Sequence, residues 1–331
     1  MVETNGGADA DPVRRVAVVG AGTMGHGIAV AFAAGGRTVR LFDADEAALD
    51  GARSAVKNAV STLVGHDAAE ADAAESVLDA IEYEPSLPDA VADADLVVEA
   101  VPEDLAIKTE TFRRVERAAP ADAVLASNTS SLSITELGDA VDDPRRLLGT
   151  HWFHPPHIVP VVEVVKGEGT ADGPVRVVRE ALEAIGKSPV VLEKEVPGFI
   201  GNRIQSAMAH EAWSLLREGV ASAEDIDTAV KGTFGFRLPA LGVFEKGDHS
   251  GLDVHAKVLS GLLDEIDRGT TPAESLTRLV EEGRYGAKTG AGVYDWSDVD
   301  VEAATDERDR QLLSLLEVYR QRERKAPPLE E

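Results

Sequence analysis

A glycine-rich turn near the start of the chain most strongly constrains its fold. Gly20-Ala-Gly22-Thr-Met-Gly25 matches the pattern G-x-G-x-x-G and stands between an apolar run at 14–20 and a helix-like run at 23–34. In that setting the first glycine permits a tight turn, the second lets the backbone approach a pyrophosphate, and the third allows close helix–strand packing. Phosphates bind free N–H groups at the start of such a helix. The predicted cofactor-binding residues of this turn are Gly20, Gly22, Thr23, Met24 and Gly25.

An acidic residue at the end of the next predicted strand identifies the cofactor more closely. Asp43 ends the run Thr38–Asp43, 23 residues after Gly20. A carboxylate at this position hydrogen-bonds the adenosine ribose hydroxyls and repels a 2′-phosphate. No arginine directly follows Asp43, and Arg40 lies within the strand. The sequence therefore predicts NAD rather than NADP as the cofactor.

Strand-like and helix-like segments alternate through the first part of the chain and then give way to helices. This βαβ rhythm continues to about residue 195 and predicts a mostly parallel sheet with helices on both faces. From Phe199 onward there is little strand signal, and several apolar helical segments follow. The expected fold is an α/β Rossmann-type NAD-binding domain at residues 1–195 followed by an all-α domain at residues 196–331.

The charge and composition exclude several classes of function. Of the 331 residues, 33 are Lys or Arg and 59 are Asp or Glu, which gives a net charge of −26. Nucleic acids and anionic membranes require basic surfaces, so neither is expected as a partner. The chain has no cysteine, which excludes disulfides, thiolate nucleophiles and Cys-based metal sites. No apolar run approaches the length needed to span a membrane. Residues 1–15 lack the apolar core of a secretory signal, so a cytoplasmic protein is expected. The acidity also predicts adaptation to high salt.

Two polar clusters are candidates for chemistry. The segment Ser127–Ser131 follows a predicted strand, where ligands bind in an open α/β sheet, although a helix cap is the alternative for some of its residues. The stretch 151–157 holds three of the eight histidines. Without an interleaved Asp, Glu or Cys a metal site is disfavoured, and His151 is interpreted as a general base oriented by Glu163 on the following strand. A structural ion pair is the alternative for these two residues.

Five ordered segments resemble one enzyme family over nearly the whole chain. They are GAGTMGHGIA, SNTSSL, the H-x-F-x-P segment followed by VEVV, PGFIGNR and KTGAGVYDW. Together they are similar to the L-3-hydroxyacyl-CoA dehydrogenase family, in particular to its members acting on short acyl chains, such as 3-hydroxybutyryl-CoA dehydrogenases. The resemblance implies oxidation of a 3-hydroxyl group with hydride transfer to NAD, and a homodimer formed through the helical domain.

The resemblance also implies roles for individual residues. His151 falls on the family's catalytic histidine and Glu163 on its carboxylate partner. Ser130 and Asn202 fall on residues that hold the substrate oxygen. The remaining implied cofactor contacts are Glu103, Lys108, Ser130 and His154.

Three departures from the family pattern bear on the substrate. His154 stands where an asparagine is usual. In the region 56–76, Lys57 and His66 are the only basic candidates for CoA phosphates, and they stand among Asp67, Glu70, Asp72 and Glu75. Arg237 lies in a segment whose sequence departs from that of CoA-using members, and its guanidinium suits a free carboxylate.

Two other functions therefore remain open from the sequence. One is dehydrogenation of a free small hydroxy acid, as in the related L-gulonate and carnitine dehydrogenases, in place of an acyl-CoA. The other is a non-catalytic NAD-binding protein, which the presence of Ser130, His151, Glu163 and Asn202 disfavours.

Overall fold

The chain is divided into two compact units. The computed structural model describes residues 13–66 and 73–321. The first unit spans Met1–Asn202 and the second spans Arg203–Glu331. The sequence placed the boundary near residue 195, whereas the structure separates the units within the first turn of helix α8 (Gly201–Arg217).

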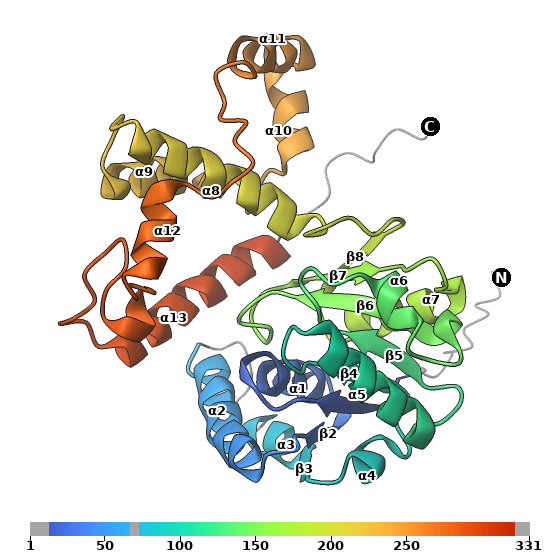
Figure 1. The fold of residues 1–331 in the computed structure, drawn as a ribbon. Coiled ribbons are helices and arrows are strands. Elements are labelled where there is room, and N and C mark those ends of the chain that lie inside the picture. The colour runs from blue at the N-terminus through green and yellow to red at the C-terminus, as the bar shows by residue number, and fades with distance from the viewer. Residues whose placement is uncertain (1–12, 67–72, 322–331) are drawn as a thin grey trace, which may run out of the picture. The chain divides into compact units, whose positions relative to one another are not determined.

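The first unit is built on one eight-stranded sheet with the strand order β3-β2-β1-β4-β5-β6-β7-β8 (Figure 1). Neighbouring strands pair in parallel except for β6 and β7, which pair antiparallel. The order 3-2-1-4-5-6 places the topological switch point between β1 and β4, where dinucleotides bind in sheets of this kind. The predicted Rossmann-type sheet is confirmed. The strands are β1 (Arg15–Val19), β2 (Thr38–Phe42), β3 (Ile81–Glu84), β4 (Leu96–Glu99), β5 (Val124–Ser127), β6 (Leu147–Trp152), β7 (Val161–Val165) and β8 (Ser188–Leu192).

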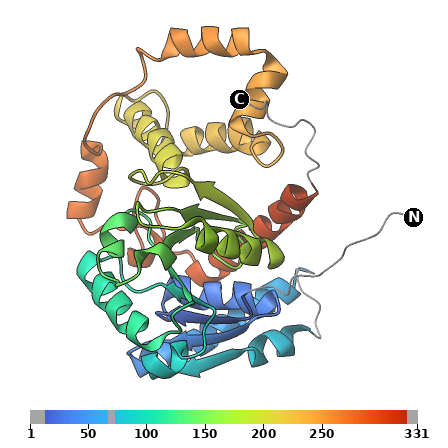
Figure 2. The same ribbon diagram turned by 90° about the vertical axis from the view of Figure 1, so that its right-hand side faces the viewer.

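Helices cover both faces of this sheet (Figures 1 and 2), as the sequence predicted. The central strands are therefore buried on both sides, and every residue of β4 and β5 is buried. The helices are α1 (Thr23–Ala34), α2 (Glu46–Val64), α3 (Ala73–Asp79), α4 (Leu87–Val91), α5 (Leu105–Ala118), α6 (Ile134–Gly138), a short 3₁₀ turn (Pro144–Arg146) and α7 (Asp172–Ala184).

Helix α5 illustrates how local sequence determines an element that borders the site. The Asp104 side chain caps it by accepting a hydrogen bond from the Ile107 amide at 3.0 Å. Its buried residues Lys108, Phe112 and Val115 recur at helical spacing and face the sheet. Lys108 thus occupies a position at which the periodicity predicts an apolar residue.

Several short elements of the first unit were not predicted, among them β3 and α4. Strand β3 has four residues and forms the sheet edge, and α4 has five residues. Segments this short give too few repeats for periodicity to be recognised. The sequence also predicts a helix over residues 68–80. The structure contains α3 from Ala73 onward, and residues 68–72 lie outside the described part of the chain.

The second unit is helical, as predicted. Helix α10 was missed, because its segment is rich in polar and small residues. Between α9 and α10 the chain forms a π-helical turn at Lys231–Gly235. The helices that follow α8 are α9 (Ala223–Val230), α10 (Val243–Ser250), α11 (Leu252–Leu262), α12 (Glu274–Glu281), a 3₁₀ turn (Ala287–Thr289) and α13 (Val301–Arg320).

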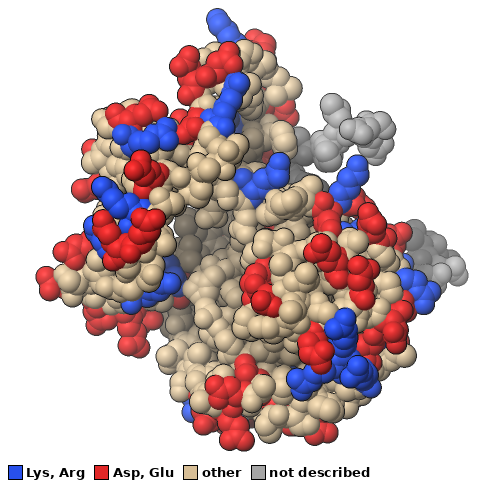
Figure 3. All heavy atoms as spheres, viewed as in Figure 1, with Lys and Arg blue, Asp and Glu red and all other residues tan. Residues whose placement is uncertain are grey.

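Acidic side chains are not confined to one part of the surface. Figure 3 shows Asp and Glu spread across the visible face of both units rather than gathered in one patch. None of the helices in the described residues has the length and apolar character needed to cross a bilayer. Adaptation to high salt stays a prediction.

Candidate active site

The glycine-rich turn joins β1 to α1 through two close approaches that only glycine permits. Gly20 has φ +110°, and a Cβ atom there would lie 2.6 Å from the Ala100 carbonyl oxygen. A Cβ atom on Gly25 would lie 1.7 Å from the Gly20 oxygen. Gly22, by contrast, faces open space and begins α1 without a side-chain cap. The first amide groups of α1 are therefore available to an anion, as the predicted pyrophosphate site requires.

Asp43 lies immediately after β2 and is held by backbone amides. Its Oδ2 accepts a hydrogen bond from the Ala21 amide at 2.8 Å, and its Oδ1 accepts one from the Asp45 amide at 3.0 Å. These bonds join the end of β2 to the glycine-rich turn. Asp43 therefore lies where an adenosine ribose would follow a pyrophosphate bound at α1.

A single pocket unites most of the predicted cofactor-binding residues. It runs along the carboxyl ends of β2, β1, β4 and β5. Gly25, Lys108 and His154 do not line it. The predicted residues that do are Gly20, Gly22, Thr23, Met24, Asp43, Glu103 and Ser130.

His151 and Glu163 are directly opposite each other on the antiparallel strands β6 and β7. His151 Nδ1 lies 2.7 Å from Glu163 Oε2, and both residues are buried. The carboxylate therefore selects the tautomer that carries a proton on Nδ1. No described residue forms a hydrogen bond with His151 Nε2, which leaves that nitrogen free to act on a substrate.

Glu163 also binds the chain segment that leads into α8. Its Oε1 accepts hydrogen bonds from the amides of Ile200 and Gly201, both at 2.9 Å. Burial raises the pKa of Glu163, but the hydrogen bonds from His151 and from these two amides outweigh that effect and lower it. Glu163 is therefore ionised at neutral pH, as a partner for an imidazolium must be.

Two aromatic rings lie close to the imidazole of His151. The centroid of Phe153 lies 4.4 Å and that of Phe199 5.5 Å from the centroid of His151. Phe199 is buried with φ 51°, a left-handed conformation that is uncommon for a bulky residue. These rings exclude water from one side of the His151–Glu163 pair and keep its interactions strong.

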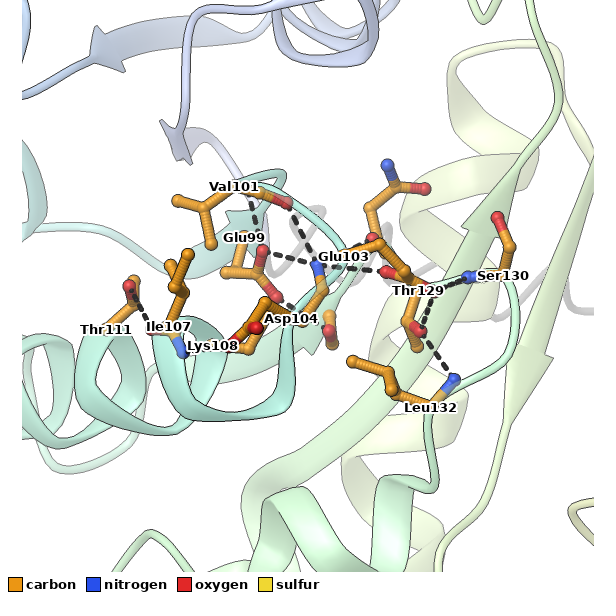
Figure 4. A network of polar contacts seen from close by, with 12 residues as sticks. Glu99, Val101, Glu103, Asp104, Ile107, Lys108, Thr111, Thr129, Ser130 and Leu132 are labelled. Carbon is orange, nitrogen blue, oxygen red and sulfur yellow. Dashed lines mark hydrogen bonds and ion pairs between the residues drawn. The ribbon is translucent and has the colours of Figure 1, made fainter. Parts of the chain in front are cut away.

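Ser130 lies in a turn that is held by Glu103 (Figure 4). Glu103 Oε1 accepts hydrogen bonds from Thr129 Oγ1 at 2.7 Å, from the Ser130 amide at 2.8 Å and from the Ser131 amide at 3.1 Å. Burial raises the pKa of Glu103, but these donors lower it by a larger amount. The carboxylate thus sets the conformation of the turn that presents Ser130 to the pocket.

Lys108 is enclosed beneath this turn. Its side chain has no exposed surface, and Nζ lies 2.7 Å from Oε1 of the equally buried Glu99. Nζ also donates to the carbonyl oxygens of Val101 at 3.2 Å and Asn128 at 3.0 Å. Glu99 accepts a further hydrogen bond from Ser127 Oγ at 2.7 Å. Lys108 therefore connects the ends of β4 and β5. Its predicted contact with the cofactor stays a prediction.

Two other predicted residues lie apart from these contacts. His154 is exposed after β6, and Asn202 is the second residue of α8. Among the described residues, no hydrogen bond joins the side chains of Ser130 or Asn202 to His151. Their roles stay predictions. The described residues also contain no group of three His, Cys, Asp or Glu side chains arranged for a metal ion.

Sequence reasoning missed Glu99, and it placed Asn128 in the candidate segment Ser127–Ser131 without predicting its hydrogen bond to the strand of His151. Asn128 Oδ1 accepts a hydrogen bond from the Trp152 amide at 3.2 Å and so connects the Ser130 turn to the strand of His151. For Glu99 a signal was present, because a carboxylate that ends the apolar run LVVE must find a buried partner. Lys108, nine residues later, supplies it.

Family models match nearly all of the described chain. One for the 3-hydroxyacyl-CoA dehydrogenase NAD-binding domain covers residues 15–196, and one for the C-terminal domain of the same family covers residues 198–296.

Two relatives and two solved structures show how the similarity is distributed. The chain is 34% identical to 5-formyl-3-hydroxy-2-methylpyridine 4-carboxylate 5-dehydrogenase of Mesorhizobium japonicum, over 94% of this chain and 100% of that enzyme. A crystal structure of a 5-dehydrogenase for this pyridine carboxylic acid, described as an NAD⁺-dependent dismutase, has a TM-score of 0.88 over the same shares. Human mitochondrial hydroxyacyl-coenzyme A dehydrogenase is 36% identical, over 86% of this chain and 91% of its own. The structure of (S)-3-hydroxybutyryl-CoA dehydrogenase from Ralstonia eutropha is 33% identical with a TM-score of 0.71, over 86% and 99%.

These matches confirm the predicted family and the predicted cofactor. They also agree with the fold of both units and with the glycine-rich turn at the switch point of the sheet. The chain therefore belongs to the 3-hydroxyacyl-CoA dehydrogenase family and is an NAD-dependent oxidoreductase.

Proposed function

We propose that the protein oxidises a short-chain L-3-hydroxyacyl-CoA to the 3-oxoacyl-CoA with His151 as the general base. The observation that carries this proposal is the buried His151–Glu163 pair, whose Nε2 forms no hydrogen bond with a described residue. An imidazole oriented in this way can accept the proton of a hydroxyl group. Glu163 then stabilises the imidazolium that forms.

The remaining steps divide between the cofactor and the protein. NAD supplies the hydride acceptor. Ser130 and Asn202 hold the substrate oxygen so that the C3–H bond points at the acceptor, and the turn around Ser130 is fixed in advance by Glu103. In the reverse direction the imidazolium of His151 returns the proton to the carbonyl oxygen.

A second substrate class is supported by specific observations. The relative from Mesorhizobium japonicum aligns over its full length and is named for a pyridine carboxylate, not a CoA thioester. Lys57 is exposed on α2, but it is the only Lys or Arg at residues 56–76. Asp67, Glu70 and Asp72 lie outside the described residues. Arg237 is exposed and has no described partner for its guanidinium, which keeps it available to a carboxylate. The second candidate is therefore a free hydroxy carboxylic acid.

A substrate comparison distinguishes the two classes. We expect purified protein in molar salt to oxidise NADH, followed at 340 nm, with acetoacetyl-CoA and at least 100-fold more slowly with acetoacetate, because binding energy from the CoA part is absent from the acid. The His151→Ala variant, purified identically, serves as the control for contaminating dehydrogenases. Turnover of free oxo acids or of a formylpyridine carboxylate, without turnover of the thioester, would select the second class.

We also propose that the helical unit forms a homodimer. Many of its apolar side chains are exposed, including Phe236 at 79% and Phe244 at 86%. Exposed apolar side chains in such number are typical of protein interfaces, and a second copy of the chain is the occupant that the family resemblance implies. The other strongly exposed apolar residues of this unit include Ile204, Val220, Leu252, Val254, Val258, Leu262 and Leu263.

Sedimentation tests the homodimer. In molar salt we expect about twice the chain mass of 35.0 kDa, and we expect Phe244→Asp to shift the protein toward the monomer because a charge would be buried at the interface. Leu105→Asp, at an exposed apolar residue of the first unit, is the matched control and should leave the mass unchanged. A wild-type protein that sediments as a monomer would refute the dimer.

A further inference from the structure

The cofactor pocket has an uneven distribution of charge. Of the described residues that line it along the ends of β4 and β5, Glu103 alone is charged. The other charged lining residues are Asp43 and Asp45, beyond β2, and Arg114, which lies on α5 three turns after Glu103. The electrostatic effect of the protein on a cofactor bound at the β4–β5 end therefore depends on Glu103 and on the cations that neutralise its charge.

Lys108 is the cation nearest to Glu103, but its charge is already matched. Nζ lies 2.7 Å from Glu99 Oε1 and 3.5 Å from Glu103 Oε2. Glu99 has no exposed surface and depends on this ammonium to remain buried as a carboxylate. Two carboxylates thus share one ammonium, and the cluster keeps one net negative charge. Because Glu103 is 38% exposed and Glu99 is not exposed, that charge faces the pocket.

The geometry of the pocket indicates which part of NAD lies beside this charge. Its β2 end holds Asp43, which fits the adenosine ribose, and the start of α1 fits the pyrophosphate. The nicotinamide half must then extend across the switch point toward β4 and β5. Glu103 and Ser130 lie at that end.

We propose that Glu103 strengthens the binding of the oxidised cofactor relative to that of the reduced cofactor. The nicotinamide ring carries a positive charge in NAD⁺ and none in NADH, whereas the adenosine and pyrophosphate parts are the same in both. An unmatched carboxylate near the ring therefore stabilises NAD⁺ selectively. Glu103 has in this view two separable roles, since its Oε1 also holds the Ser130 turn.

Glu103→Gln separates these roles. A glutamine keeps an oxygen that can accept the hydrogen bonds from Thr129, Ser130 and Ser131, but it removes the charge. Isothermal titration or the quenching of tryptophan fluorescence gives the Kd of each cofactor form without any turnover. We expect the Kd for NAD⁺ to rise about five- to tenfold and the Kd for NADH to change less than twofold. Raising the salt from 0.1 M to molar concentration should reduce the difference, because ions screen the remaining solvent-exposed part of the interaction.

Glu110→Gln is the matched control. Glu110 is exposed on α5, the helix that follows Glu103, does not line the pocket and has no described partner. Its loss makes the same change in net charge and should leave both Kd values unaltered. Three outcomes would overturn the proposal: an equal weakening of both cofactor forms in Glu103→Gln, which would indicate a purely positional role, no change in either form, or the same selective loss in Glu110→Gln.

Discussion

Replacement of His151 by alanine is expected to lower the turnover number by about 10² to 10⁴-fold, the usual contribution of a positioned general base. The Kd for NADH should remain within twofold of the wild-type value, because His151 does not line the cofactor pocket. Stopped-flow absorbance at 340 nm gives the first quantity, and fluorescence titration gives the second. A large fall in the turnover number with an unchanged Kd for NADH identifies a residue that acts on the substrate and not on cofactor binding.

His151→Asn serves as the second variant, because its amide can still donate a hydrogen bond to Glu163 in place of Nδ1–H. It should fold like the wild type and be as slow as the alanine variant. A His151→Asn enzyme with near-normal turnover would contradict the proposed mechanism. A loss of NADH binding in both variants would instead show that the pair has a structural role.

Lys108→Met is expected to destabilise the protein by about 3–5 kcal/mol, because it removes one partner of an ion pair with no solvent exposure. Glu99 would remain buried without a cation, with only the Ser127 hydroxyl and the Val101 amide as donors. Burial already raises the pKa of Glu99, and loss of the ammonium should raise it further and favour uptake of a proton. Urea unfolding followed by circular dichroism measures the change in the free energy of unfolding.

The double variant Glu99→Gln/Lys108→Met removes both charges and should regain part of the loss, because no unpaired charge is left. Arg113→Met is the matched control: Arg113 is exposed on the same helix, and its loss should change the free energy of unfolding by less than about 0.5 kcal/mol. A destabilisation below about 1 kcal/mol in Lys108→Met would mean that the buried pair contributes little to the fold.

The parts of the structure that the sequence predicted well depend on local rules. The turn at Gly20–Gly25 is determined by steric approaches within a few residues, and Asp43 follows from the strand that precedes it. The pairing of His151 with Glu163 follows from two adjacent strands whose register places them opposite each other. In each case the interacting groups lie on consecutive elements, so spacing along the chain is informative.

The parts that escaped prediction depend on exceptions to ordinary side-chain burial and on side-chain contacts that no known motif specifies. Lysine is ordinarily a surface residue, and no local pattern shows that Lys108 would be enclosed by Glu99 and Asn128. The hydrogen bond from Trp152 to Asn128 joins two segments that are 24 residues apart. Short elements such as β3 were missed because four residues at a sheet edge carry almost no periodic signal.

The two hydrogen-bonding faces of Glu163 limit where this protein can be recombined with its relatives. One oxygen orients His151, and the other holds the backbone at Ile200 and Gly201, beyond the predicted boundary at residue 195. In a chimera joined at residue 195, Glu163 would come from this protein but the amides at positions 200 and 201 would come from the relative. The orientation of His151 would then depend on how well the relative's segment places those two amides. A junction placed after Asn202 keeps the carboxylate and all its donors from one parent. Exchange of helical units to alter substrate choice is therefore best designed from that position.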